Sequence, residues 1–351
     1  LALLDDADED ADAFGTEEVV AELVPVVRRQ MEKRALDEGL RAFGQQKDLT
    51  QISDILSQAY RLGSSEHSLG SRLGAASMEQ IEYLRTLKRL PTGISELDAA
   101  LAGGMERGSL GLFVGPTGSG KSMSLGHVGC NAATNGLSVA YATLELGVPH
   151  IFARLIGNLA AIPSEDILND PRSMDTARKR MQLLEDRNMI GQTTVRYFTA
   201  HATTVDDLRD WLEEEEKASS RKIDLLCVDY ATLLSEPSKK LKHEELTSIA
   251  EKLRALAADK NIWIWSAAQS NAEAQHRKTK KIDSHHTAGS MGLPRTADLV
   301  ITLNPRDEGS TMMFRIAKNR YGRAGEDVGP LPHEFEMGRV SPVLREGWPW
   351  Q

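Results

Sequence analysis

One segment of the chain has the residue types and spacing needed to hold the phosphates of a nucleotide. It consists of Gly115, Pro116, Thr117, Gly118, Ser119, Gly120, Lys121 and Ser122. This phosphate loop, or P-loop, fits the pattern G-x-x-x-x-G-K-[ST] at every fixed position. Its glycines let backbone N–H groups surround phosphates, Lys121 is expected to reach the β- and γ-phosphates, and the Ser122 hydroxyl is expected to bind Mg²⁺. The alternative is a glycine-rich turn between a strand and a helix, with an incidental lysine.

Two acidic residues have the positions that hydrolysis of a bound nucleotide requires. Asp229 ends the apolar run at 224–229, so its carboxylate can face a Mg²⁺ ion near Ser122. Glu145 follows the run at 138–144, at the edge of a parallel sheet where ligands bind. A carboxylate there can accept a proton from the attacking water. The alternatives are an Asp that begins a turn and a Glu that meets only solvent.

The apolar pattern after residue 90 predicts the elements that must position these groups. Strands are expected at 110–114, 138–143, 194–198, 224–229, 262–267, 299–303 and 312–317. Helices are expected at 122–135, 204–219 and 242–259. Strands alternating with helices predict an α/β fold with a mainly parallel central sheet. The last two runs follow one another closely, and we expect them to form hairpin additions at one edge.

The net charge of −9 is concentrated at one end of the sequence. The first 18 residues hold eight Asp and Glu and no Lys or Arg, so the remainder has 43 acids against 42 bases. This balance excludes a globally basic nucleic-acid-binding protein but allows a local basic patch. We expect a disordered acidic tail at 1–16, a mainly helical segment at 17–90 and one α/β domain at 91–351.

The cysteines and the apolar runs indicate the compartment. Cys130 and Cys227 are too few for a disulfide framework or a four-ligand zinc site, and we expect both to be buried, reduced thiols. No apolar run approaches the ~20 residues of a membrane span. An intracellular, reducing compartment is therefore expected. Trp263 and Trp265 alternate within one apolar run and are expected to pack in the core.

Five motifs follow one another along residues 90–345. They are 91–98, Leu144-Glu145-Leu146, Val228-Asp229-Tyr230, Ser266-Ala267-Ala268-Gln269 and Ala317-Lys318-Asn319-Arg320. In this order they resemble the RecA-like motor domain of the replicative DnaB-type DNA helicases, whose fold the more distant RadA and KaiC share. The resemblance implies a RecA-like P-loop NTPase core. It also implies that Glu145 is the catalytic base and that Gln269 senses the γ-phosphate. Lys318 and Arg320 would act as fingers on the nucleotide of a neighbouring subunit.

A dense basic run follows the predicted γ-phosphate sensor. Residues 276–281 include Arg277, Lys278, Lys280 and Lys281. In the family that the chain resembles, the loop at this place lines a central pore and touches the DNA backbone. Lysine and arginine on a loop suit sequence-independent contacts with phosphates, and the run has no aromatic residue for stacking on bases. The alternative is a solvated surface loop.

The resemblance implies a ring-forming, ATP-dependent DNA helicase that moves along single-stranded DNA during replication, with ATP and Mg²⁺ bound. The resemblance also implies a hexamer, 5′→3′ travel, contacts with a primase or helicase loader, and a place in the cytoplasm of a bacterial or phage-infected cell. No membrane partner is expected. Two other functions stay open: a KaiC-like regulatory scaffold, and a RadA-like recombination motor, whose Lys-Asn-Arg-Phe-Gly string resembles residues 318–322.

Overall fold

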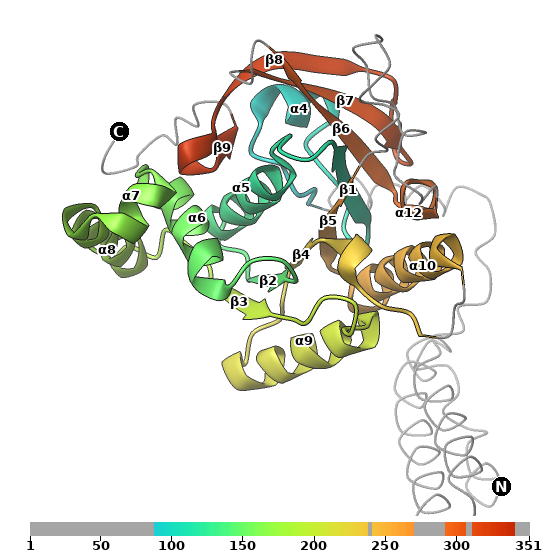
Figure 1. Cartoon of the computed structure of the whole chain (residues 1–351), viewed down its shortest axis with the longest axis horizontal. Coiled ribbons are helices and arrows are strands. Elements are labelled where there is room, and N and C mark those ends of the chain that lie inside the picture. The colour runs from blue at the N-terminus through green and yellow to red at the C-terminus, as the bar shows by residue number, and fades with distance from the viewer. Residues whose placement is uncertain (1–87, 238–240, 270–291, 307–310, 341–351) are drawn as a thin grey trace, which may run out of the picture. The chain divides into compact units, whose positions relative to one another are not determined.

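A computed structural model describes residues 88–237, 241–269, 292–306 and 311–340 (Figure 1). These residues belong to one compact unit, Thr86–Gln351. The predicted acidic tail at 1–16, the predicted helical segment up to residue 87 and the basic run at 276–281 lie outside the described residues.

Helices and strands alternate along most of the described chain. In order they are α4 (Ser95–Ala100), β1 (Leu110–Gly115), α5 (Lys121–Thr134), β2 (Val139–Thr143), α6 (Val148–Ala160), α7 (Ser164–Asn169), α8 (Pro171–Asp186), β3 (Thr193–Tyr197), α9 (Val205–Ser219), β4 (Leu225–Asp229), the 3₁₀ turn η1 (Ala231–Leu233), α10 (Lys242–Lys260), β5 (Trp263–Gln269), α12 (Gly292–Thr296), β6 (Leu299–Arg306), β7 (Thr311–Asn319), β8 (Asp327–Glu334), the 3₁₀ turn η4 (Phe335–Met337) and β9 (Arg339–Val340). All seven predicted strands and all three predicted helices are present, with their ends displaced by a few residues.

The strands form one nine-stranded sheet in the order β3-β2-β4-β5-β1-β6-β7-β8-β9. The strands from β3 to β6 in this order are parallel, and β7, β8 and β9 are added antiparallel at one edge. The predicted α/β class, the mainly parallel sheet and the hairpin additions are therefore confirmed. Figure 1 shows β6, β7 and β8 together at the top of the view.

The central strands are buried on both faces of the sheet, which explains their nearly continuous apolar sequence. Leu110, Leu112 and Val114 of β1 belong to a cluster that includes residues of α9 and α10. Phe113, which alternates with them, belongs to a second cluster with residues of α5 and α6. Figure 1 shows these two pairs of helices on opposite sides of the sheet. The period-two alternation of strands thus gives each helix layer its own apolar surface.

The tryptophans and cysteines have the buried positions that the sequence predicts. Trp263 and Trp265 are 1% and 0% exposed, and Trp265 stacks on Phe113 with ring centroids 4.5 Å apart. Cys130 and Cys227 are both buried and free of disulfides. Burial raises the pKa of the Cys227 thiol well above its usual value, so this thiol stays protonated and unreactive.

Three helices, α6, α7 and α8, lie between β2 and β3. In the basic segment of α8, Arg180 donates hydrogen bonds to the carbonyls of Ala160 and Ala161. Arg180 thereby satisfies carbonyls at the end of α6 that have no partner within the helix. Arg178, by contrast, is exposed. Within the described part of the chain, no helix has the length and apolar character to cross a membrane.

Gly111 leaves the space that the Trp265 ring occupies, and we expect Gly111→Ala to destabilise the fold. A Cβ at residue 111 would lie 2.8 Å from a ring carbon of Trp265 and from the sulfur of Met105. Overpacking of this kind costs about 1–3 kcal/mol. Urea unfolding should show that loss in the free energy of unfolding.

Gly129→Ala, within α5, is the matched control. A Cβ at residue 129 would lie 3.6 Å from the Cys227 sulfur and 3.8 Å from a methyl carbon of Val139, which is ordinary contact. Exchange of glycine for alanine inside a helix should raise the free energy of unfolding by up to about 1 kcal/mol. Equal unfolding curves for Gly111→Ala and the unmodified chain would mean that Trp265 does not need this space.

Candidate functional site

The phosphate loop joins the end of β1 to the start of α5, as predicted. Gly118 and Gly120 have φ angles of 76° and 83°, in the left-handed region that glycine adopts most readily. At Gly115 a Cβ would lie only 2.4 Å from the Ser119 hydroxyl oxygen. The glycines of the motif are therefore required by the backbone path and by the packing inside the loop.

Two polar groups inside the phosphate loop fit an anionic ligand. Lys121 is only 6% exposed, and its Nζ donates to the Pro116 carbonyl at 2.6 Å. Burial lowers the pKa of Lys121, while the charges of Asp229 and Glu145 act in the opposite direction. The Ser119 hydroxyl is buried and has no hydrogen-bond partner among the described residues. A phosphate would satisfy both groups.

Asp229, at the end of β4, lies against the first turn of α5. Its Oδ1 accepts a hydrogen bond from Ser122 Oγ at 3.1 Å, and its Oδ2 accepts one from the Tyr141 hydroxyl at 3.1 Å. Burial raises the pKa of Asp229 to about 6, although both hydrogen bonds act to lower it. The structure thus brings together the two residues predicted to hold Mg²⁺.

Magnesium at this place would depend on the nucleotide for part of its coordination. Among the described residues, His, Cys, Asp and Glu form no group of three that could hold a metal ion. Mg²⁺ commonly takes one or two protein ligands and completes its shell with water and substrate phosphates. The hydroxyl of Ser122 and the carboxylate of Asp229 fit that pattern.

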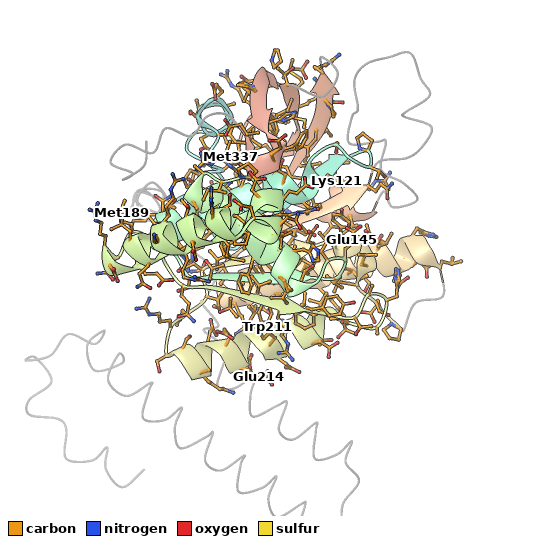
Figure 2. The ribbon with its side chains drawn as sticks, turned by 60° about the vertical axis from the view of Figure 1, so that its left-hand side comes forward. Lys121, Glu145, Met189, Trp211, Glu214 and Met337 are labelled. Atoms are coloured by element: carbon orange, nitrogen blue, oxygen red, sulfur yellow. The ribbon has the colours of Figure 1, made fainter. Side chains whose placement is uncertain are left out.

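Glu145, directly after β2, is exposed and is linked to this cluster through Tyr230. The Tyr230 hydroxyl lies 3.2 Å from Ser122 Oγ and is close enough to Glu145 for the two side chains to interact. Burial, followed by the charge of Asp229 and the contact with Glu145, raises the pKa of Tyr230 to about 12. The charge of Glu145 also acts on Lys121, and both residues are labelled in Figure 2. Tyr230 belongs to a motif that is recognisable in the sequence, but no pattern predicted a contact for its side chain.

Gln269 is the last residue of β5 and lies beside the phosphate loop. It pairs with Gly115 across the parallel ladder between β1 and β5. Its Nε2 donates to the Thr117 hydroxyl at 2.6 Å. The strand order therefore brings the predicted sensor to the loop that it would sense.

A cavity of about 350 Å³ lies beside the phosphate loop. Its lining includes Lys121, Ser122, Tyr230, Arg154, Phe335 and Gly338. The Phe335 ring is 39% exposed, and a Cβ at Gly120 would lie 2.6 Å from it. Asn158 of α6 donates to the Gly338 carbonyl at 2.6 Å, which ties the chain after β8 to this side of the sheet. No sequence motif indicated that Arg154 and Phe335 belong to this site.

Lys318 and Arg320 do not join this cluster. Lys318 pairs with Val300 near the start of β6, and β6 runs parallel to β1. Lys318 and Arg320 therefore lie at the edge of the sheet where β1 begins, whereas the phosphate loop follows the end of β1. The rise of ~3.3 Å per residue along a strand puts the two edges roughly 16 Å apart.

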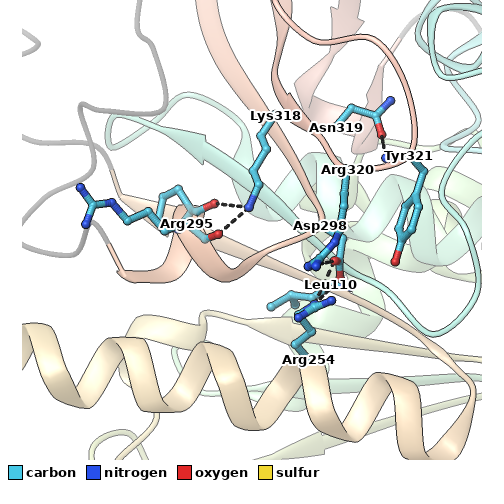
Figure 3. Close-up of polar contacts among 9 residues, drawn as sticks. Leu110, Arg254, Arg295, Asp298, Lys318, Asn319, Arg320 and Tyr321 are labelled. Carbon is cyan, nitrogen blue, oxygen red and sulfur yellow. Dashed lines mark hydrogen bonds and ion pairs between the residues drawn. The ribbon is translucent and has the colours of Figure 1, made fainter.

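Lys318 and Arg320 contact residues near their own edge of the sheet (Figure 3). Lys318 Nζ donates to the Arg295 carbonyl, and an Arg320 nitrogen lies 3.3 Å from the Asp298 carboxylate. The predicted DNA-contacting residues, Arg277, Lys278, Lys280 and Lys281, lie outside the described residues.

Comparison with known proteins finds helicases and a DNA repair protein. Over 282 residues, the chain is 22% identical to a DnaB-like replicative helicase of Enterobacteria phage T4, covering 78% of this chain and 59% of that protein. It is 25% identical over 264 residues to the DNA repair protein RadA of Mycobacterium tuberculosis, covering 75% of this chain and 46% of RadA. The chain thus spans about half the length of these relatives.

The fold agrees with these similarities. A solved structure of a DnaB-like replicative helicase, which also describes its interactions with primase, superposes with a TM-score of 0.69 at 18% identity, covering 92% of this chain and 77% of the other. Residues 89–329 match the family model of the DnaB-like helicase C-terminal domain. That match includes the phosphate loop, the cluster around Asp229 and the pair at the opposite edge of the sheet. The chain belongs to the family of DnaB-like helicase C-terminal domains.

Proposed function

We propose that the chain is an ATP-driven DNA helicase motor whose hydrolysis site forms between two subunits. The observation that carries this proposal is the distance between the phosphate loop and the pair Lys318 and Arg320, which lie at opposite edges of one sheet. A guanidinium is a planar, permanently charged fork that suits phosphate oxygens. Because Arg320 lies far from the phosphate loop of its own chain, its phosphate partner would belong to a neighbour.

The residues around the phosphate loop would divide the work of hydrolysis. Lys121 would exchange the Pro116 carbonyl for phosphate oxygens, and Glu145 would accept a proton from the attacking water. Ser122 and Asp229 would hold Mg²⁺, which when bound neutralises negative charge on the phosphates. The exposed ring of Phe335 offers an apolar face to the nucleotide base.

Assembly follows from a site that needs two chains. Each subunit would supply a phosphate loop to one neighbour and Lys318 with Arg320 to the other. Such a head-to-tail contact forms a ring when the rotation between subunits closes. We propose a hexamer. Membership in the family supports four further parts of the proposal. These are a role in replication, 5′→3′ travel, contact with a primase or loader, and a cytoplasmic location.

Single-stranded DNA is the proposed track. Gln269 contacts Thr117 of the phosphate loop, and it is the last described residue before the segment that contains 276–281. A segment that begins at the proposed γ-phosphate sensor can transmit the state of the nucleotide to its basic residues. The similarity to RadA supports a recombination motor as the second candidate, and a scaffold that ignores DNA is the third.

Replacing the proposed base should stop turnover while nucleotide binding continues. We expect Glu145→Gln to lower kcat for ATP hydrolysis by about 10²–10⁴-fold, the usual range for general acid–base catalysis. Phosphate release measures kcat, and titration with a fluorescent ATP analogue measures Kd. The matched control is Glu214→Gln on α9, which removes an exposed carboxylate far from Lys121 in Figure 2 and should keep the original rate. Wild-type turnover of Glu145→Gln would contradict the assignment.

Mixed assemblies test whether the site is shared. Arg320→Ala subunits keep the phosphate loop, and Lys121→Ala subunits keep the finger, so each is inactive alone. In a one-to-one mixture, about a quarter of the interfaces join an intact loop to an intact finger, and ATPase activity should return to that extent. Size-exclusion chromatography checks that the two variants co-assemble. Co-assembly without any return of activity would exclude a finger that acts between subunits.

Neutralising the basic run should weaken the response to DNA. We expect Lys280→Gln/Lys281→Gln to lower stimulation of the ATPase by single-stranded DNA and to reduce the salt slope of binding by about 1.4. Arg178→Gln/Lys179→Gln removes the same charge from the exposed face of α8 and is the matched control. If the unmodified chain shows neither binding to single strands nor stimulation by them, the scaffold function replaces the helicase function.

A further inference from the structure

The buried carboxylate of Asp298 joins three segments at the edge of the sheet that carries Arg320 (Figure 3). Asp298 is 1% exposed and lies between α12 and β6. Its Oδ1 accepts a hydrogen bond from Arg254 Nε at 2.9 Å and lies 3.3 Å from Arg320 Nη1. Its Oδ2 accepts one from the main-chain N–H of Leu110 at 3.1 Å. One carboxylate is therefore shared by two arginines and the first residue of β1.

Main-chain hydrogen bonds reinforce the same connections. The N–H of Arg320 donates to the Asp298 carbonyl at 2.8 Å, and the N–H of Asp298 donates to the Leu110 carbonyl at 2.9 Å. Asp298 thus holds both Arg320 and Leu110 through its backbone as well as its side chain. These paired contacts fix the place of the Arg320 backbone and restrict the direction of its guanidinium.

The charges around Asp298 allow Arg320 to exchange partners. A buried carboxylate that loses its only cation is strongly destabilising. Here Arg254 and the Leu110 N–H remain bonded to the carboxylate when Arg320 leaves it. The Arg320 side chain is 49% exposed, in contrast to the buried acid. The contact therefore orients the guanidinium without locking it in place.

We propose that Asp298 is the positioning residue of the Arg320 finger. Its carboxylate holds the guanidinium at the subunit surface, in the orientation from which it reaches the γ-phosphate of a neighbouring chain. A charged group that is already oriented loses less freedom when it meets the transferring phosphoryl group, and a displacement of ~1 Å can cost about 10²-fold in rate. This inference rests on the proposed function of Arg320 between subunits.

Asp298→Asn tests the proposal in the full chain, because asparagine keeps the shape and loses the charge. We expect kcat for ATP hydrolysis to fall by about 10- to 100-fold while KM changes little. Arg320→Ala should lower kcat further, by about 10³-fold or more. The double variant Asp298→Asn/Arg320→Ala should be no slower than Arg320→Ala, because an acid that acts through Arg320 has nothing left to position.

Arg254→Gln is the matched control for a structural role. It removes the other arginine from the same carboxylate and should lower Tm as Asp298→Asn does, while kcat stays within about threefold of wild type. The variant Asp298→Asn/Arg254→Gln replaces the ion pair by a neutral pair and covers the case in which Asp298→Asn alone does not fold. It should show the same 10- to 100-fold loss in kcat.

The outcomes separate this inference from the proposed function. If Arg320→Ala keeps its turnover, the finger itself is wrong. If Arg320→Ala loses turnover but folded, assembled Asp298→Asn or Asp298→Asn/Arg254→Gln keeps it, only the positioning role is wrong. The double variant Asp298→Asn/Arg320→Ala gives a further test. If its kcat is lower than that of Arg320→Ala by the factor that Asp298→Asn alone produces, Asp298 acts independently of Arg320 and the inference is overturned.

Discussion

The length and direction of β1 constrain everything else that this chain can do. β1 lies between β5 and β6, is buried along its whole length and is held in register from both sides. Its first residue is bonded to Asp298, and its last residue opens the phosphate loop. An extended strand cannot shorten, so the two edges of the sheet keep their separation. Under the proposed function, a complete site therefore needs a second chain.

At the end of β1 the nucleotide site is organised by buried polar contacts. Lys121 and Asp229 place opposite charges inside the protein, where an ion without partners would be costly. The Pro116 carbonyl accepts from Lys121, and hydroxyls of Ser122 and Tyr141 donate to Asp229. These contacts hold both charged groups in place before any phosphate arrives. Such preorganisation lowers the cost of orienting groups during a reaction.

Much of the fold was predictable because its signals are local. Strands buried on both faces have continuous apolar sequence, and each of the seven predicted ones is present. α6 was predictable in principle, since Ile151, Leu155 and Leu159 are buried at four-residue spacing along one face. α8 gave little signal, because only Ala177 and Leu184 are buried along it. A helix with so few buried residues has the composition of a surface segment.

For the site, prediction succeeded where one segment carries the chemistry and was incomplete where segments meet. The phosphate loop was recognisable because its glycine positions are demanded by φ angles and close packing within a few residues. No local pattern indicated three features that join distant segments. These are the interaction of Tyr230 with Glu145, the Phe335 ring beside the phosphate loop, and the contacts of Asp298 with Leu110 and Arg320.

The α/β class, the phosphate loop and the resemblance to a helicase motor could all be read from the amino-acid sequence, because hydrophobic pattern and backbone requirements are local properties. The folded arrangement of the strands was needed to learn that Asp229 contacts Ser122, that Gln269 contacts Thr117 and that Arg320 lies at the opposite edge of the sheet. Strand order and register set those distances. Both arise from hydrogen bonds between strands far apart along the chain, which no local pattern records.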